Sequence, residues 1–303
     1  MTRDAATTLE DAVNVGRLST FSRLTKSMVR NYLLKLSREY MADGAAQMVV
    51  FSFDHIGHSI NLYRFYENDG LNLIAHWLKR NNLIRACAVD IGANIGNHSL
   101  FFSRHYRTVF AFEPNPRTYE VLKLNSKLAN NIITYNFGLS DTSDSVTLTQ
   151  DNLNVGHSAI ASRIERPQSS VTQFDITVRA LDEVADVRQA EIALIKIDVE
   201  GHELPALIGA TEIIKKNRPI ILFEQHANEL RDGSSSVIDY LRSLGYRRFA
   251  VLQERPTMPQ RIPRMLRIPL TICARMLFGT TYFIKEVESF KTAFYSLIIA
   301  VPD

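Results

Sequence analysis

An apolar run that ends in an acid and leads into a glycine-containing loop constrains the fold of this chain more than any other feature. Residues 88–90 end this run at Asp90, and Gly92 and Gly96 follow in the loop. A second apolar run, residues 109–112, leads to Glu113. Glycine lets the backbone turn sharply and approach a ligand, and an acid after the second strand accepts hydrogen bonds from ribose hydroxyls. The two runs predict a nucleotide-type site at the carboxyl ends of neighbouring parallel strands.

The spacing of the glycines indicates which nucleotide derivative binds there. A dinucleotide site uses G-x-G-x-x-G, which places a helix N-terminus against a pyrophosphate. This chain has G-x-x-x-G behind an acid and no phosphate-binding loop, which favours S-adenosylmethionine, a compound with a ribose and an amino acid but no phosphate. We expect Asp90, Gly92, Asn94 and Gly96 to hold its methionine part, and Glu113 to hold its ribose. A nicotinamide-dependent oxidoreductase is the alternative.

Apolar runs typical of strands alternate with helical patterns along most of the chain. This alternation with short links predicts an α/β fold, with a mostly parallel sheet covered by helices on both faces and a ligand crevice at the carboxyl ends of the strands. Two additional strands are expected at 145–149 and 171–179, on either side of a polar stretch. The main strands are expected at residues 85–90, 108–113, 132–137, 192–198, 219–224, 247–252 and 294–301, and the helices from residue 97 and at 116–128, 203–216 and 234–244.

Residues 1–66 form an N-terminal extension in this interpretation. Apolar residues at helical spacing predict a helix over residues 21–40, which either packs on the following domain or faces a membrane or partner. Two apolar runs, 48–53 and 59–64, predict a hairpin. A helix is expected at 67–80, where the catalytic domain begins.

The charge of the chain is small but unevenly distributed. Its 303 residues have a net charge of +3, which does not imply a nucleic-acid partner. Basic residues gather between Arg17 and Arg38 and in a C-terminal segment, 255–290, of the domain formed by residues 67–303. Such local positive fields suit contact with a membrane surface or an anionic glycan. A non-catalytic membrane- or polyanion-binding protein is therefore a second alternative.

Targeting signals and the two cysteines say little about the function of the chain. No apolar run approaches the roughly 18 residues of a membrane span, and no signal peptide is visible. Cys87 and Cys273 lie in apolar runs and are expected to be buried thiols. We expect a cytoplasmic protein, at most peripheral at the inner face of a membrane.

Two turns after neighbouring strands carry ionisable side chains. The first turn contains Asp198, Glu200 and His202, and the second contains Glu224 and His226. Methyl transfer to an alcohol requires removal of the hydroxyl proton, and a histidine oriented by a carboxylate suits this task. We expect His202 or His226 to be the base, with Glu200 or Glu224 as the orienting carboxylate or as an acceptor of sugar hydroxyls.

The same carboxylates permit another chemistry. Asp198, Glu200, Glu224 and His226 offer oxygen and nitrogen ligands to a divalent cation, although we do not predict a metal. The other histidines, among them His98, have no partner motif, so a structural role is the default for each.

A turn after the third strand is the candidate adenine site. Leu139 can pack on the adenine ring, and Asp141 can accept a hydrogen bond from its amino group, with Ser140 between them. A hairpin turn rich in Ser and Asp is the alternative interpretation of this segment.

Several strings in the chain occur together in one known family. They are VDIGANIG (89–96), FEPN (112–115), LSD (139–141), LIKIDVEGHE (194–203), LFEQH (222–226) and FYSLIIAVP (294–302), preceded by Tyr66-Glu67. With these strings, the chain resembles the FkbM-type methyltransferases from about residue 66 to residue 302.

The resemblance implies a Rossmann-like class I methyltransferase domain with a seven-stranded sheet whose final strand is antiparallel. It also implies O-methylation, often of a sugar hydroxyl in a glycan, glycolipid or secondary metabolite, with S-adenosylhomocysteine as the second product. A nucleobase acceptor is disfavoured, because the turn after residue 197 lacks the N/D-P-P-aromatic pattern. With the resemblance, the expected cofactor-binding residues are Glu67, Asp90, Gly92, Asn94, Gly96, Glu113, Asn115, Leu139, Ser140, Asp141 and Asp198.

Overall fold

The chain divides into two compact units, Met1–Ala45 and Ala46–Asp303. In the first unit, α1 (Thr20–Ala42) is a single helix, as the sequence predicted. Residues 46–66, assigned to the N-terminal extension from sequence, are part of the larger unit. None of the helices in the described ranges is long and apolar enough to cross a membrane. The structure, a computed structural model, describes residues 20–81, 86–151, 154–160, 171–256 and 280–303.

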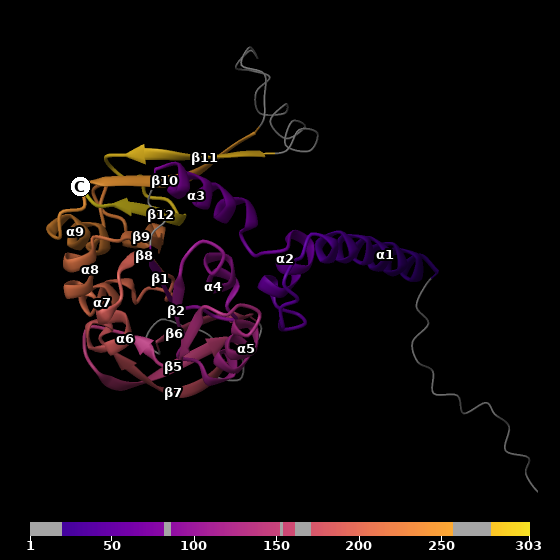
Figure 1. Ribbon diagram of the computed structural model, residues 1–303. Helices are drawn as coiled ribbons and strands as arrows, with labels where there is room; N and C mark the ends of the chain where they lie inside the picture. Colours follow the sequence, from indigo (N-terminus) through magenta and orange to yellow (C-terminus); the bar gives the residue numbers. More distant parts are fainter. Residues whose placement is uncertain (1–19, 82–85, 152–153, 161–170, 257–279) are drawn as a thin grey trace, which may run out of the picture. The chain divides into compact units, whose positions relative to one another are not determined.

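The larger unit is built on an eight-stranded sheet with the order β11-β10-β12-β9-β8-β1-β2-β3 (Figure 1). Neighbouring strands from β3 to β9 pair in parallel, whereas β12 is antiparallel to β9 and β10, and β11 is antiparallel to β10. The predicted Rossmann-like α/β fold with an antiparallel final strand is therefore confirmed. The strands are β1 (Cys87–Ile91), β2 (Thr108–Phe112), β3 (Ile132–Tyr135), β8 (Ile192–Ile197), β9 (Ile220–Gln225), β10 (Arg248–Pro256), β11 (Thr280–Val287) and β12 (Tyr295–Val301).

The expected number of seven strands was wrong, because β11 adds an eighth at the edge of the sheet. An edge strand pairs on one side only and buries little, so its sequence need not contain a continuous apolar run. Residues 280–287 were therefore assigned to the basic segment 255–290 instead. Most of that segment, residues 257–279, lies outside the described residues.

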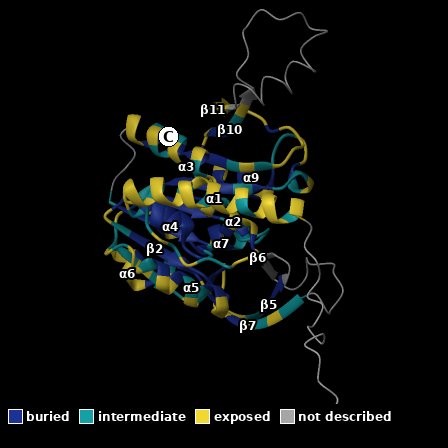
Figure 2. Ribbon diagram, turned by 90° about the vertical axis from the view of Figure 1, so that its right-hand side faces the viewer, coloured by how far each residue is buried: buried dark blue, intermediate teal, exposed yellow. Residues whose placement is uncertain are grey.

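Both faces of the sheet are covered by helices, which explains why its central strands are apolar throughout. On one face, Val89 and Ile91 belong to the core cluster that includes α7, α8 and α9. On the other face, Ala88 belongs to the cluster that includes α3 and α4. All residues of α4 are buried, and the helix is dark blue in Figure 2. The helices are α2 (His55–Tyr63), α3 (Asn68–Arg80), α4 (Asn97–Phe102), α5 (Pro116–Ser126), α6 (Ala185–Gln189), α7 (Glu203–Ile208), α8 (Thr211–Asn217) and α9 (Ser236–Ser243).

The predicted helix 203–216 is divided into α7 and α8 at Gly209. A Cβ atom at this position would lie 1.9 Å from the carbonyl oxygen of Ser140. The chain therefore approaches another backbone segment closely at this point, and only glycine fits there.

The predicted hairpin at residues 48–64 was wrong. Residues 55–63 form helix α2, and residues 48–53 form no strand. The backbone N–H of Val49 donates to Oδ1 of Asn125 at 2.7 Å, and Nδ2 of Asn125 donates to the Val49 carbonyl at 2.9 Å. A side chain thus satisfies the backbone groups that a partner strand would have paired.

A second sheet is inserted between β3 and β8, with the order β4-β7-β5-β6. The sequence predicted the strands near 145–149 and 171–179 but not β6, which lies in the stretch interpreted as polar. Leu148, Ile176 and Val178 form a small buried cluster on this sheet. Its strands are β4 (Gly138–Leu139), β5 (Asp144–Asp151), β6 (Asn154–Ile160) and β7 (Val171–Arg179).

Candidate functional site

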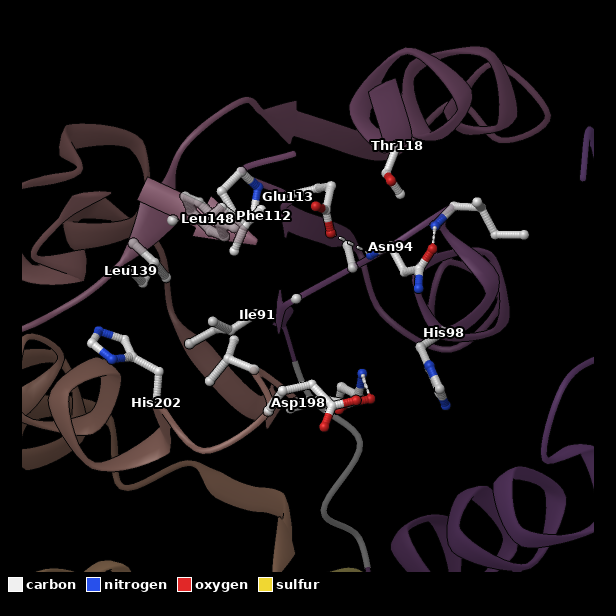
Figure 3. Close-up of a pocket in the computed structure, with 18 of the residues that line it drawn as sticks. Ile91, Asn94, His98, Phe112, Glu113, Thr118, Leu139, Leu148, Asp198 and His202 are labelled. Atoms are coloured by element: carbon white, nitrogen blue, oxygen red, sulfur yellow. Dashed lines mark hydrogen bonds and ion pairs between the residues drawn. The ribbon is translucent and has the colours of Figure 1, made fainter. Parts of the chain in front are cut away.

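A cavity, here called the first cavity, lies at the carboxyl ends of β1, β2 and β8 (Figure 3). This is the edge of the sheet at which the sequence placed the ligand crevice. The expected site residues that line it are Gly92, Asn94, Glu113, Leu139, Asp198, Glu200 and His202.

The loop after β1 is held in a conformation that requires glycine at its start. Gly92 has φ of 76°, and a Cβ atom there would lie 1.9 Å from the Asp198 carbonyl oxygen. Asn94 also has a positive φ of 51°, and its backbone N–H donates to Glu113 at 2.9 Å. Gly96, with φ of 90°, is the N-cap residue of α4 and does not line the first cavity. The loop thus packs its backbone against β8 and the end of β2.

Glu113 lies in the cavity wall with its carboxylate partly satisfied. One oxygen accepts the N–H of Asn94 and the other accepts the N–H of Asn115, each at 2.9 Å. A carboxylate offers about four acceptor positions, so two remain for a ligand. Burial raises the pKa of Glu113 to about 7, because the charged form loses its hydration. The position suits hydrogen bonds from a vicinal diol.

Asp90 does not face the cavity, so the expected direct contact with a cofactor ammonium group is corrected. Its side chain is 0% exposed, and Oδ2 accepts a hydrogen bond from the Ser99 hydroxyl at 2.6 Å. Its Oδ1 lies 3.7 Å from Nζ of Lys196. Because β1 is covered on both faces, a carboxylate near its end is enclosed instead of reaching the opening.

Lys196 was missed as a site residue. It lies on β8, its Nζ is 3.1 Å from Asp198 Oδ2, and it reaches the first cavity. Burial alone would lower the pKa of Lys196, but Asp198 and Asp90 outweigh that effect and hold the pKa above its usual value. The available signal was a lysine within an otherwise apolar strand, which must be paired if it is buried.

The part of the first cavity that lies away from Lys196 and Asp198 is apolar. Its walls include Phe112 and Leu139, together with Leu148, Ile176 and Val178 of the second sheet. Flat aromatic rings bind well between such side chains. This wall depends on the inserted sheet, so only Leu139 was predicted.

Besides Asp90, Gly96 and Glu67, three further expected cofactor contacts do not line the first cavity. Asn115 is buried and caps α5, since its Oδ1 accepts the N–H groups of Arg117 and Thr118. Ser140 donates to Asp141 at 3.0 Å and lies 3.0 Å from Nε2 of His202. Asp141 itself is exposed. Asn115 is thus enclosed, whereas contact of Ser140 and Asp141 with a ligand stays a prediction.

A second cavity of about 520 Å³ opens beside the first. Tyr66, His98, Lys196 and Asp198 line both cavities, so the two meet at these side chains. Its volume falls in the range typical of small-molecule sites. The carboxylates that line it are those of Glu67, Asp69, Asp198 and Glu224.

The two predicted catalytic turns have different surroundings. His226 Nε2 lies 3.3 Å from Glu224 and 3.8 Å from Glu200. Burial, together with Asp198 and Glu200, raises the pKa of Glu224 to about 8. In Figure 3, His202 lies on the same side of the pocket as Leu139, and His98 lies on the opposite side. Glu200, Glu224 and His226, here called the Glu–His cluster, each offer one ligand atom within 4.8 Å of the others and could hold a metal ion.

Comparison with known proteins identifies related methyltransferases. A family model described as the methyltransferase FkbM domain matches residues 90–248. The chain is 29% identical over 214 residues to the hexuronic acid methyltransferase AglP of Haloferax volcanii, covering 70% of this chain and 82% of AglP. It is 28% identical over 188 residues to methyltransferase 1 of Beauveria bassiana, covering 55% of this chain and 74% of that protein.

Among solved structures, the chain is similar to the methyltransferase FkbM of Methylobacillus flagellatus, with a TM-score of 0.41 and 16% identity. The match covers 89% of this chain and 60% of that one, so the chain spans less than two thirds of its length. Magnesium protoporphyrin IX methyltransferase of Synechocystis matches with a TM-score of 0.38 and 9% identity, covering 92% of this chain and 96% of that one.

Proposed function

The chain belongs to the FkbM methyltransferase family, and we propose that it transfers the methyl group of S-adenosylmethionine to a hydroxyl group of a sugar. Membership of this family favours the methyltransferase over the oxidoreductase and the non-catalytic alternatives raised by the sequence.

The residues of the first cavity fit the proposed cofactor. Glu113 has unused acceptor positions for the two ribose hydroxyls, and the apolar wall around Leu139 suits the adenine ring. Gly92 leaves the space in which the loop backbone can approach the methionine part. Asp198 adds a negative charge where the cavities meet, close to the place expected for the sulfonium. Bound there, the cofactor supplies a methyl group activated by the positive sulfur.

The observation that carries the sugar assignment is the lining of the second cavity. Four carboxylates face a space that meets the first cavity, and carboxylates accept hydrogen bonds from sugar hydroxyls. Leu71, Leu222 and Leu252 provide apolar surface for the carbon face of a ring. The similarity to a hexuronic acid methyltransferase supports the same class of acceptor.

The chemistry needs a base near the methyl group. The acceptor oxygen displaces sulfur from the methyl carbon, and its proton must leave as the new bond forms. The sequence assigned this task to His202 or His226, with Glu200 or Glu224 as partner and Asp198 nearby. Substitution of each by alanine or an amide, with turnover and cofactor affinity measured separately, tests these assignments.

The proposal is tested by incubating the protein with trideuteromethyl S-adenosylmethionine and glycosides of glucose, glucosamine and glucuronic acid. Mass spectrometry should detect one trideuteromethyl group on an acceptor, and base-stable linkage identifies an ether rather than an ester. Glu113→Ala should reduce this labelling, whereas Glu120→Ala, at an exposed glutamate of α5, should not. Labelling of other hydroxyl compounds while sugars, including longer glycans, stay unlabelled would contradict the sugar assignment.

A further inference from the structure

We propose that His98 is the general base of the methyl transfer and that Glu67 orients its ring. This inference rests on the proposed function, and it replaces both His202 and His226 in the role of base. His98 had no partner motif in the sequence.

The position of His98 is what distinguishes it. Of the histidines in the described part of the chain, His98 lines both cavities, whereas His202 lines only the first and His55 only the second. His226 lines neither of the two. A base must touch the acceptor hydroxyl while that hydroxyl contacts the methyl carbon. Only a side chain at the junction of the two cavities meets this requirement.

Glu67 supplies the carboxylate that a catalytic histidine needs. Its Oε2 lies 3.3 Å from Nε2 of His98. A carboxylate at one ring nitrogen fixes the tautomer and leaves the other nitrogen as the proton acceptor. The cofactor contact expected for Glu67 from the sequence stays a prediction, and Glu67 lines the second cavity.

The backbone holds the two residues together. The N–H of Tyr66 donates to Oδ1 of Asn97 at 2.9 Å, and Nδ2 of Asn97 donates to the Tyr66 carbonyl at 3.1 Å. These reciprocal bonds join the residues immediately before Glu67 and His98. The His98 ring also packs between Tyr66 and Phe102, with centroid distances of 6.5 and 6.3 Å. The pair is therefore positioned before any ligand binds.

The two histidines predicted from sequence are occupied elsewhere. His202 Nε2 lies 3.0 Å from the Ser140 hydroxyl, near the apolar end of the first cavity. His226 lies against the Phe294 ring and within 3.3 Å of Glu224. His202 lines the first cavity without the second, and His226 lines neither of them.

His98 takes up the proton that the acceptor hydroxyl loses during methyl transfer. The acceptor O–H bond breaks and its proton moves to His98, while the oxygen forms a bond to the methyl carbon. The carbon–sulfur bond breaks, and its electron pair remains on sulfur. His98 then returns its proton to solvent. Glu67 lies 3.3 Å from the His98 ring and Tyr66 packs on that ring, while Asp198 and Lys196 line both cavities together with His98.

The test compares His98→Gln and Glu67→Gln with His76→Gln, which replaces an exposed histidine of α3. Turnover of the labelled sugar is measured with S-adenosylmethionine in excess to give kcat and KM, and S-adenosylhomocysteine affinity is measured by calorimetry. His98→Gln should lower kcat by about 10²- to 10⁴-fold with nearly unchanged affinity. In Glu67→Gln kcat should also fall while KM and S-adenosylhomocysteine affinity stay near wild type, because the ring loses its orienting carboxylate. His76→Gln should match the wild type.

Several results would overturn the assignment. One is a His98→Gln protein with wild-type turnover. Another is loss of turnover that merely follows lost cofactor affinity. If His98→Gln does not fold, Glu67→Gln decides alone, and a kcat equal to that of the wild type counts against the pair. Failure of the wild-type protein to label any sugar would contradict the proposed function instead.

Discussion

Substitution of Lys196 by methionine tests the charge arrangement beneath the site. Nζ of Lys196 lies 3.1 Å from Asp198 and 3.7 Å from Asp90, and the Asp90 side chain is 0% exposed. At an effective dielectric constant of about 20, the pair with Asp90 is worth roughly 4 to 5 kcal/mol before desolvation is subtracted. The pair with Asp198 is worth less than its shorter distance suggests, because solvent screens a side chain that is 35% exposed. Removing one partner of a buried pair typically costs about 3–5 kcal/mol, because the remaining charge is uncompensated. Lys196→Met should lower the free energy of unfolding by that amount.

Urea denaturation at neutral pH measures this loss, and a double variant identifies its cause. Asp90→Asn combined with Lys196→Met removes the fully buried carboxylate charge, so the double variant should recover a large part of the stability. Lys215→Met, at an exposed ion pair with Glu212, should change stability by less than about 1 kcal/mol. A Lys196→Met protein within 1 kcal/mol of wild type, or a double variant no more stable than the single one, would refute the reasoning.

The stability difference between wild type and Lys196→Met should depend on pH. Burial alone would raise the pKa of Asp198, but Lys196 outweighs it and holds the pKa below its ordinary value. A carboxyl group with a lowered pKa stabilises the fold above that ordinary value and loses its contribution as the pH falls. The stability difference between wild type and Lys196→Met should therefore narrow toward acidic pH.

The remaining predictions concern the two cavities. Gly92→Ala should abolish S-adenosylhomocysteine binding in calorimetry, because its Cβ atom would lie 1.9 Å from the Asp198 carbonyl oxygen; Gly44→Ala, at a similar φ of 68° but with open space around it, should bind normally. Equal affinities would contradict this account of the loop. The pKa of Glu113 is raised to about 7, so ionisation of Glu113 lowers the stability of the fold as the pH rises toward 7. Ribose binding, in contrast, needs the ionised carboxylate. Affinity for S-adenosylhomocysteine should thus increase from about pH 6 to 8, and a flat profile identical to that of Glu113→Gln would argue against this role. Removal of divalent cations with EDTA should leave turnover unchanged, and restoration of a lost activity by Mn²⁺ would instead assign a metal to the Glu–His cluster.

The layout of the fold was readable from the sequence because strands covered on both faces must be apolar throughout. The runs ending near Asp90, Glu113 and Asp198 gave the correct edge of the sheet, since parallel strands bring their carboxyl ends together. What the runs could not give was the direction of each side chain. Asp90 and Asn115 stand in the expected strings, yet one is enclosed by Ser99 and Lys196, and the other caps a helix.

Contacts between distant segments account for most of the remainder. Glu67 is the N-cap residue of α3 and His98 lies on α4, and these segments meet through the Tyr66–Asn97 hydrogen bonds. No local pattern encodes this pairing. The side chain of Asn125 likewise replaces a partner strand for Val49, so a run that looked like half of a hairpin remains unpaired. The apolar wall of the first cavity is formed partly by the inserted sheet. The alternation of residues along the chain does not show where that sheet packs.

The central claim is that the first cavity holds the methyl donor with its sulfur directed to the opening shared with the second cavity. A crystal structure of the protein with S-adenosylhomocysteine tests it most directly. The account predicts ribose hydroxyls on the Glu113 carboxylate, adenine against the wall around Leu139, and sulfur near Asp198 and His98. A ligand bound elsewhere, or one whose ribose makes no contact with Glu113, would contradict it.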